Sequence, residues 1–351
     1  MQNIPLALTY DDVLLVPQYS EIKSRQDVDL KTRITPSLEI DFPLISINMD
    51  TVTGVDMAIA MSNYGALSFY PRFQQPKDQL KDIQKVLKKA KNVVPAIGIK
   101  EGEFERAKLL YENGIKIITI DVAHGHLKSS LDMVKKLKKT FKGLEVIAGV
   151  VATYEGARDL FEAGADAVRV GVGPGTVCTT RVVTGFGVPQ ITAVLEASRA
   201  GKEFKRPIIS DGGTKTTGDI VKVLAAGANA VVTGSQLAGT KESPGEAIEI
   251  NGTLHKPYNG STSKTEKVKQ YMQNPKDKSS FYVEYVEGVE AFVPYKGTVA
   301  DVLGKMEKGI RSAYSYCGAR NIDELHKKAK FIQVTTAGVS ESGAHGVVIK
   351  S

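Results

Sequence analysis

Short apolar runs alternate with amphipathic helical patterns along most of this chain. The apolar runs occupy residues 43–48, 66–70, 94–99, 116–121, 145–149, 167–172, 207–211 and 229–234. Between them lie segments such as 103–114 and 154–164, which carry apolar residues at helical spacing and end in glycine, a frequent helix C-cap. Strands that are apolar throughout are typical of a parallel sheet buried on both faces. The pattern therefore predicts eight strand–helix units.

Eight such units close a (β/α)8 (TIM) barrel. The rival architecture, an open doubly wound sheet, carries a glycine-rich fingerprint after its first strand, and here Asn48-Met49-Asp50 follows the first apolar run instead. We therefore predict an α/β fold in which residues 1–351 form a single barrel domain. A barrel active site lies at the C-terminal ends of the strands. Polar residues follow several of the predicted strands there, among them Arg72, Asp121 and Asp211.

The strand–helix alternation stops after Gly239. Residues 240–297 lack strong periodicity and are rich in Lys, Ser, Asn and Gly. Long irregular insertions in compact domains are usually lids or disordered segments. We predict a flap over the barrel mouth, mobile around 274–277, that can carry Glu287 to the site; the alternative is that Glu287 is a surface carboxylate. Helices at 299–316 and 322–330 and an extended tail at 334–347 are expected after the flap.

Composition and charge narrow the class of protein. No apolar run approaches the roughly 18 residues of a membrane span, and the N-terminus lacks a secretory pattern. Two cysteines in 351 residues favour a reducing compartment, so we expect a cytoplasmic protein with no membrane partner. The net charge of +7 comes largely from lysines spread along amphipathic helices. It favours an anionic small-molecule substrate over nucleic acid.

The most distinctive stretch is GVGPGTVCTTR, residues 171–181. Three glycines and a proline within five residues exclude a regular element, so the stretch is a loop that follows a strand. Cys178 is followed by two hydroxyl side chains and by Arg181. A cation lowers a thiol pKa and a hydroxyl can transfer a proton, so this setting favours a nucleophile over a small buried cysteine. The other cysteine, Cys317, is interpreted as structural.

Two further loops combine small residues with an expected helix start. They are SDGG, at 210–213, and TGSQLAG, at 233–239. Backbone N–H groups at helix starts bind anions, and barrels often hold phosphate in the loops after the seventh and eighth strands.

These motifs resemble those of the IMP dehydrogenase and GMP reductase family of (β/α)8 barrels. The resemblance covers nearly the whole chain and includes TYDDVLLVP, NMDTV, DVAHGH, GVGPGTVCTTR and GSQLAGTKESPGE. It implies that Cys178 attacks C2 of a purine ring while Thr180 and Glu287 handle the proton. It implies a nucleotide monophosphate site formed by Asn48, Met49, Asp211, Gly213, Gly234, Ser235, Tyr258 and Gly260, with Asp121 and Arg72 toward a nicotinamide cofactor.

The resemblance leaves two reactions open. One is NADPH-dependent deamination of GMP to IMP, and the other is NAD-dependent oxidation of IMP to XMP. The dehydrogenase branch activates water with an Arg-Tyr pair in its flap, where this chain has Gln270-Tyr271. An amide does not replace a guanidinium. Asn48 and Val122 also resemble the reductase, and no room exists for the inserted regulatory domains of the dehydrogenase before the third strand. The reductase is our leading expectation.

Other features resemble the dehydrogenase, namely EGVEAFVPYKG and the tail VTTAGVSES, in which Glu341 matches a carboxylate that helps to bind a monovalent cation. The resemblance implies a potassium site of backbone carbonyls at Gly173, Gly175 and Cys178, and a homotetramer. Three positions depart from the family pattern: Val150 for an asparagine, Arg72 for a lysine of the reductase, and Thr176 for a phosphate-contacting serine. A non-catalytic nucleotide-binding regulator is a further alternative, which the complete Cys178-Thr180-Glu287 set disfavours.

Overall fold

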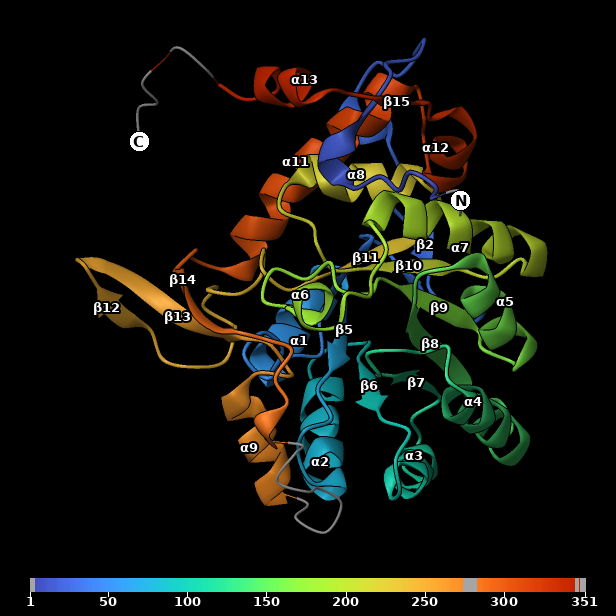
Figure 1. The fold of residues 1–351 in the computed structure, drawn as a ribbon, viewed down its shortest axis with the longest axis vertical. Coiled ribbons are helices and arrows are strands. Elements are labelled where there is room, and N and C mark those ends of the chain that lie inside the picture. The colour runs from blue at the N-terminus through green and yellow to red at the C-terminus, as the bar shows by residue number, and fades with distance from the viewer. Residues whose placement is uncertain (1–3, 274–282, 345–346, 348–351) are drawn as a thin grey trace.

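Each apolar run of the sequence corresponds to one strand of a closed parallel barrel. We analysed a computed structural model, which describes residues 4–273, 283–344 and 347 (Figure 1). Each barrel strand pairs with the strand of the next unit, and the last pairs with the first. The strands are β4 (Leu44–Ser46), β5 (Leu67–Tyr70), β6 (Val94–Ile97), β7 (Ile117–Ile120), β8 (Glu145–Val151), β9 (Ala167–Val170), β10 (Ile208–Asp211) and β11 (Ala230–Thr233). The predicted (β/α)8 barrel is confirmed.

Helices follow the strands and cover the outside of the barrel. They are α1 (Val55–Asn63), α2 (Pro76–Leu87), α3 (Glu103–Glu112), α4 (Lys128–Thr140), α5 (Tyr154–Glu162), α7 (Gln190–Phe204), α8 (Thr217–Ala225) and α11 (Val299–Cys317). Local residues fix the start of α8. The Thr216 hydroxyl accepts from the backbone N–H of Asp219, and the carboxylate of Asp219 accepts from the backbone N–H of Thr216. Cys317 is buried at the end of α11, in agreement with a structural role.

A hairpin closes the N-terminal end of the barrel. It consists of β2 (Thr32–Arg33) and β3 (Glu39–Ile40), and its apolar side chains Ile34, Leu38 and Ile40 pack with the residues of the barrel interior, such as Phe69. Because side chains fill this end of the described barrel, we expect a ligand to enter the interior from the C-terminal rim.

The two chain ends meet outside the barrel. The 3-10 helix η1 (Tyr10–Asp12) leads into β1 (Val13–Leu15), which pairs antiparallel with β15 (Phe331–Gln333); η2 (Arg25–Asp27) precedes the hairpin, and α12 (Ile322–Lys328) precedes β15. The extended tail predicted for 334–347 is wrong in part, because residues Thr336–Glu341 form α13. The Thr335 hydroxyl caps this helix by accepting from the backbone N–H of Gly338.

The segment predicted as an irregular flap has a structure of its own. It contains a three-stranded antiparallel sheet, β12 (Ile248–Ile250), β13 (Thr253–Asn259) and β14 (Glu290–Pro294), and the helix α9 (Lys264–Gln273). In Figure 1 the sheet projects to the left of the barrel, with α9 below it. We call residues 248–273 and 283–294 the flap. The tract 274–277, predicted to be mobile, lies outside the described residues.

Candidate active site

Cys178 lies on the loop that connects β9 to the short helix α6 (Thr180–Thr184). The loop begins so close to β10 that a side chain cannot fit: a Cβ atom on Gly171 would stand 2.1 Å from the carbonyl oxygen of Asp211. Gln190, at the start of α7, fixes the same point by donating to the carbonyl of Val170 (2.7 Å). The glycines of the loop therefore allow the backbone to pass against the neighbouring strand end and leave Cys178 at the mouth.

The expectation that Arg181 acts on the thiol by its charge is not supported by its contacts. Its guanidinium donates to the backbone carbonyls of Val188 (2.6 Å) and Val172 (3.3 Å). These bonds join the two ends of the loop. Arg181 therefore holds the two ends of the loop backbone together. A lysine would do this less well, because it lacks the rigid fork of N–H donors with which a guanidinium reaches two carbonyls.

A hydrogen-bonded chain leads from the thiol to the flap. Cys178 Sγ lies 3.1 Å from Thr180 Oγ1, and this hydroxyl donates to Glu287 Oε2 at 2.7 Å. The backbones pair at the same place, since Thr179 N donates to the carbonyl of Glu287 (3.0 Å) and Val289 N to that of Val177 (3.0 Å). The structure thus brings Glu287 to Thr180, rather than leaving it as an isolated surface carboxylate.

Glu287 also contacts other flap residues. The hydroxyl of Tyr285 hydrogen-bonds to its carboxylate, and this bond is the main cause of a raised pKa of Tyr285. Burial lowers the pKa of Lys267, and the negative charge of Glu287 opposes that shift. Lys267 in turn donates to the carbonyl of Tyr285. The carboxylate therefore sits in a polar environment that the flap supplies.

All the residues that the sequence assigned to the site line one cavity of about 240 Å³. The predicted nucleotide site contributes Asn48, Met49, Asp211, Gly213, Gly234, Ser235, Tyr258 and Gly260, and the remaining positions are Arg72, Asp121, Gly173, Gly175, Cys178, Thr180 and Glu287. These residues come from the loops after six barrel strands and from the flap. The fold therefore brings all of these positions to one cavity at the barrel mouth.

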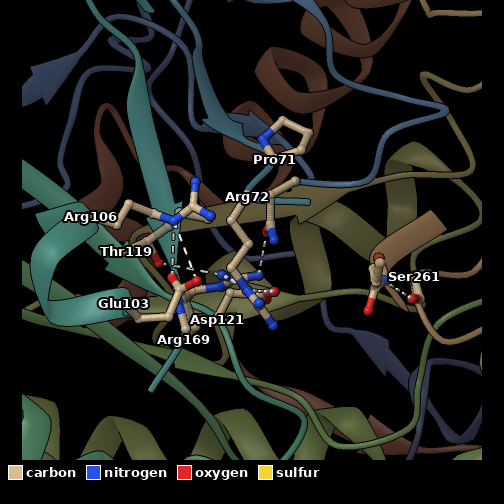
Figure 2. A network of polar contacts seen from close by, with 12 residues as sticks. Pro71, Arg72, Glu103, Arg106, Thr119, Asp121, Arg169 and Ser261 are labelled. Carbon is tan, nitrogen blue, oxygen red and sulfur yellow. Dashed lines mark hydrogen bonds and ion pairs between the residues drawn. The ribbon is translucent and has the colours of Figure 1, made fainter. Parts of the chain in front are cut away.

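Arg169 is a site residue that the sequence reasoning missed. It is 2% exposed and donates to Asp211 (2.8 Å), Asn48 (3.0 Å) and Thr119 (3.3 Å), and it also lies 3.5 Å from the carboxylate of Asp121 (Figure 2). Burial raises the pKa of Asp211, and the adjacent guanidinium opposes this shift. The available signal was a charged residue inside an otherwise apolar strand, because a buried cation needs anionic partners.

The two loops predicted to bind phosphate differ from expectation. No helix begins directly at Gly213, since α8 starts at Thr217, and the 233–239 segment forms a turn rather than a helix start. Lys296, another residue not anticipated, donates to the carbonyl of Ser235 (2.5 Å), and burial lowers its pKa. Tyr10 donates to the carbonyl of Gly212 (2.8 Å). Backbone groups of both loops are therefore held by side chains from distant segments.

A second cavity of about 550 Å³ adjoins the first and shares Arg72, Phe73, Val122 and Ala123 with it. Arg72 Nε lies 3.5 Å from a carboxylate oxygen of Asp121, and its guanidinium carbon lies 4.4 Å above the ring of Phe73. We call this space the cofactor-side cavity. Gln270 of the flap also lines it, and donates to the carbonyl of Ser261 (2.9 Å).

A polar network supports the strand ends below the cofactor-side cavity. Gln79 donates to the carbonyls of Pro71 and Ala96 (both 2.9 Å), and Arg106 donates to Gln79 (3.1 Å). Glu103 pairs with Arg106 (3.2 Å) and accepts from the backbone N–H of Gly98 (2.6 Å). Figure 2 shows Arg106 and Glu103 to the left of Arg72 and Asp121. The network fixes the backbone that carries Arg72.

The loop residues implied for a cation, Gly173, Gly175 and Cys178, line the first cavity, and a cation there stays a prediction. The carbonyl of Gly175 accepts the backbone N–H of Cys178 (3.1 Å), whereas Glu341 is exposed on α13, far from α6 in Figure 1. Over residues 4–273, 283–344 and 347, no group of three or more His, Cys, Asp or Glu side chains could hold a metal ion. Val150 and Thr176, which depart from the family pattern, both line the first cavity.

The fold and the cavity define a class: a (β/α)8 barrel with a cysteine, a threonine and a glutamate in hydrogen-bonded sequence at its rim, beside two adjoining cavities. The chain belongs to the IMP dehydrogenase / GMP reductase family, because the sequence model of that domain matches residues 7–345. Members of the family are oxidoreductases that act on purine nucleotides with a nicotinamide cofactor. In the described part of the chain, no helix has the length and apolarity needed to cross a membrane.

Individual relatives represent both branches of the family. The chain is 34% identical to inosine-5′-monophosphate dehydrogenase of Nitrosopumilus maritimus over 472 aligned positions, covering 97% of this chain and 98% of the relative. It is 38% identical to the dehydrogenase of Cryptosporidium parvum over 397 positions, covering 99% and 97%. A similar solved structure is a Cys→Ala variant of GMP reductase from Trypanosoma brucei in complex with guanosine 5′-monophosphate, with a TM-score of 0.92, 27% identity and coverage of 98% and 99%.

Proposed function

We propose that this protein is a GMP reductase that converts GMP and NADPH to IMP, ammonia and NADP. The observation that carries the proposal is the continuous chain from Cys178 through Thr180 to Glu287, at 3.1 and 2.7 Å. The resemblance in fold to a GMP reductase that binds guanosine 5′-monophosphate adds support. A cytoplasmic location, expected from the low cysteine content, and a homotetramer, implied by the family resemblance, belong to the same proposal.

The chain from thiol to carboxylate supports a balanced first step. The thiol proton passes through the Thr180 hydroxyl to Glu287 as the sulfur bonds to C2 of the guanine ring. Glu287 returns this proton through Thr180 to the amino group, which leaves C2 as ammonia. A covalent bond between the purine and Cys178 remains. Asp211 and the loops at Gly213 and Ser235 hold the ribose and the phosphate during this step.

The second step would release Cys178 as a thiolate, which takes one proton from solvent to regenerate the thiol. A bound nicotinamide cofactor would supply the hydride that replaces Cys178 sulfur at C2, and IMP would be the product. Asp121 and Arg72 face the cofactor-side cavity and would hold the cofactor there. The adjoining cavities would place the cofactor beside the nucleotide. Proximity of this kind is a main source of rate enhancement in hydride transfer.

The flap favours deamination over hydrolysis. Gln270 occupies the position nearest to the arginine that activates water in the dehydrogenase branch, and its amide is a donor to Ser261. A neutral amide neither takes a proton from water nor stabilises a hydroxide. The alignment with the Nitrosopumilus maritimus dehydrogenase is also longer than the 351 residues of this chain, so that relative carries segments that this chain lacks.

The second candidate is an IMP dehydrogenase without a regulatory domain. The specific observation in its favour is the 38% identity to the Cryptosporidium parvum dehydrogenase over 397 positions, a length much closer to that of this chain. This candidate forms XMP and NADH from IMP, NAD and water, and it is stimulated by potassium. Another group would then have to activate water.

A paired assay separates the two candidates. We expect the absorbance of the reduced nicotinamide to fall with GMP and NADPH, with one ammonia released per NADPH consumed. A rise in absorbance with IMP and NAD, greater in potassium than in sodium, would instead establish the dehydrogenase. The Cys178→Ala protein should bind GMP and lose at least about a thousand-fold in kcat in either assay. Full turnover by this variant would disprove the covalent mechanism for both.

A further inference from the structure

Lys256, on β13, is a buried cation that the proposed reaction does not use. The residue is 5% exposed, and its ammonium group donates to the backbone carbonyls of Thr240 (3.1 Å), Lys241 (3.3 Å) and Ser243 (2.5 Å). We call these three carbonyls the carbonyl cage. We propose that Lys256 is a positioning residue: its ammonium group fills the carbonyl cage and thereby fixes a wall of the nucleotide site.

The carbonyl cage matches a protonated amine. An ammonium group has three N–H donors, one for each carbonyl around Lys256 Nζ. Glu242, in the same loop, accepts from the backbone N–H of Val299 (2.8 Å), so the carbonyl dipoles are the direct partners of the charge. Burying a charge is costly, and a methionine in its place would fill the space without that cost. The cation is therefore explained by what it joins, namely the loop 240–243 and β13.

The loop that forms the carbonyl cage is packed closely against two strands of the flap. A Cβ atom on Gly239 would stand 2.4 Å from the carbonyl oxygen of Pro294, at the end of β14. A Cβ atom on Gly245 would stand 2.6 Å from Cγ of Pro257, on β13. The two glycines flank the cage in the sequence, so the loop backbone meets the flap on both sides of it. Lys256 supplies a charged contact at this junction.

The same junction sets one wall of the first cavity. Tyr258 follows Lys256 by two residues, so both side chains leave β13 on the same face, and both residues are buried. The Tyr258 hydroxyl lies against the loop after β11, since a Cβ atom on Gly234 would stand 2.9 Å from it. The backbone N–H groups of Leu237 and Ala238 donate to the carbonyl of Gly234 (3.1 and 2.8 Å), in the turn that leads to the cage. Displacement of Lys256 would therefore shift Tyr258 relative to Gly234.

Chemical rescue in the ligand-free protein tests the carbonyl cage without any turnover. In Lys256→Ala the missing atoms are those of n-propylammonium, so this cation should enter the cage from solvent. The amides of Lys241 and Ser243 donate to the carbonyls of Gly297 (2.8 Å) and Thr240 (3.2 Å), and their hydrogen exchange reports on the loop. Their protection should fall at least ten-fold in Lys256→Ala and return to within about two-fold in n-propylammonium chloride. Tetramethylammonium chloride of equal ionic strength has no N–H donor and should restore nothing.

Two further variants serve as controls for the rescue. Lys241→Ala truncates an exposed lysine of the same loop but leaves its carbonyl in the cage, so it should keep the protection of the unmodified chain. Lys256→Met keeps the space filled but has no donor, so it should lose protection and gain none from n-propylammonium. If Lys256→Ala is unfolded in both salts, the loss of protection in Lys256→Met decides.

Three results would overturn the proposal. The first is unchanged loop protection in Lys256→Ala or in Lys256→Met. The second is a folded Lys256→Ala protein that n-propylammonium does not rescue. The third is rescue that tetramethylammonium achieves equally well, because that would reflect ionic strength rather than donation to the carbonyls.

Steady-state kinetics tests the consequence for the site, and this consequence rests on the proposed function. The KM for the nucleotide should rise roughly ten-fold in Lys256→Met while kcat changes less than about two-fold, because the wall contacts the nucleotide equally in the ground state and the transition state. The KM for the nicotinamide cofactor should stay unaltered. An equal rise in both KM values, or an unaltered KM for the nucleotide, would contradict the positioning role.

The two experiments also separate this inference from the proposed function. Loss and rescue of loop protection in a protein without GMP or IMP turnover would contradict the proposed function and leave the carbonyl cage intact. Turnover of GMP by a protein in which Lys256→Met retains full loop protection would support the proposed function and overturn the role of Lys256.

Discussion

The barrel and the flap both supply groups to the site, but they are encoded differently in the sequence. The barrel strands are buried on both faces, so each appears as an apolar run that a reader can locate. The strands of the flap are exposed at alternate positions or over much of their length. A strand that is buried on both faces can therefore be recognised in a sequence. A strand that is ordered because it packs against another part of the chain cannot.

Strand β13 illustrates why the flap sheet was not predicted. One of its inward positions is a lysine, Lys256, which is 5% exposed and donates to the backbone carbonyls of Thr240 (3.1 Å) and Ser243 (2.5 Å). The next residue, Pro257, argues against a strand because it lacks an N–H group. Lys256 is buried with its ammonium group bonded to carbonyls, and Pro257 is a residue type found mainly in edge strands. Both residues hide the two-residue alternation of apolar and polar positions that identifies a strand. The flap has a polar interior where the barrel has an apolar one.

The largest effect is expected for Arg169, the buried charged residue in the otherwise apolar strand β9. Arg169→Met leaves Asp211 buried without its cation, so we expect the free energy of unfolding to fall by about 3–5 kcal/mol. Urea denaturation measures it. The control Arg199→Met removes an exposed guanidinium that pairs with Glu196 at 2.7 Å and should cost at most about 1 kcal/mol. Equal costs for the two variants would mean that Asp211 is uncharged in the folded protein.

The same contrast explains how much of the site the sequence could predict. The rim residues could be predicted because strand ends are visible and a barrel brings them together, and all of the assigned positions line one cavity. Arg169 was missed because its partners come from three different strands or the residues that follow them, and Lys296 because it reaches Ser235 from 61 positions away. The contacts of Arg181 were misjudged because sequence proximity to Cys178 does not fix the direction of a long side chain.

The contribution of the flap to catalysis should be separable from its contribution to the stability of the fold. Glu287→Gln keeps an oxygen that can accept from Thr180 but cannot take a proton, so we expect kcat to fall by about 10²–10³ with an unchanged melting temperature. The control is Glu284→Gln, an exposed glutamate of the same segment, which should retain full activity. Steady-state rates and thermal melts measure both.

The double variant Thr180→Val/Glu287→Gln sharpens this test. If both groups carry the same proton, the double variant should be no slower than the slower single variant, because the path is already interrupted. Additive losses in kcat would show instead that barrel and flap act on separate steps.

The smallest expected effect concerns a residue that joins the two regions. Lys296 follows β14, and its ammonium group donates to the carbonyls of Ser235 (2.5 Å) and Gln236 (3.4 Å) in the loop after β11. Lys296→Met removes the charged donors of these two hydrogen bonds. A hydrogen bond to a charged group is worth about 1.5–3 kcal/mol, but Lys296 is exposed, so water can replace part of this loss. We therefore expect the KM for the nucleotide to rise roughly ten-fold while kcat changes less than about two-fold.

Lys308→Met, which alters an exposed lysine of α11, is the matched control for this change and should leave both constants unaltered. The division between KM and kcat is informative because the loop would hold the phosphate, which is bound equally in the ground state and the transition state. A loss in kcat with an unaltered KM would mean that Lys296 places the flap over Cys178 rather than the loop over the phosphate. The flap would then govern chemistry through its backbone connection to the barrel as well as through Glu287.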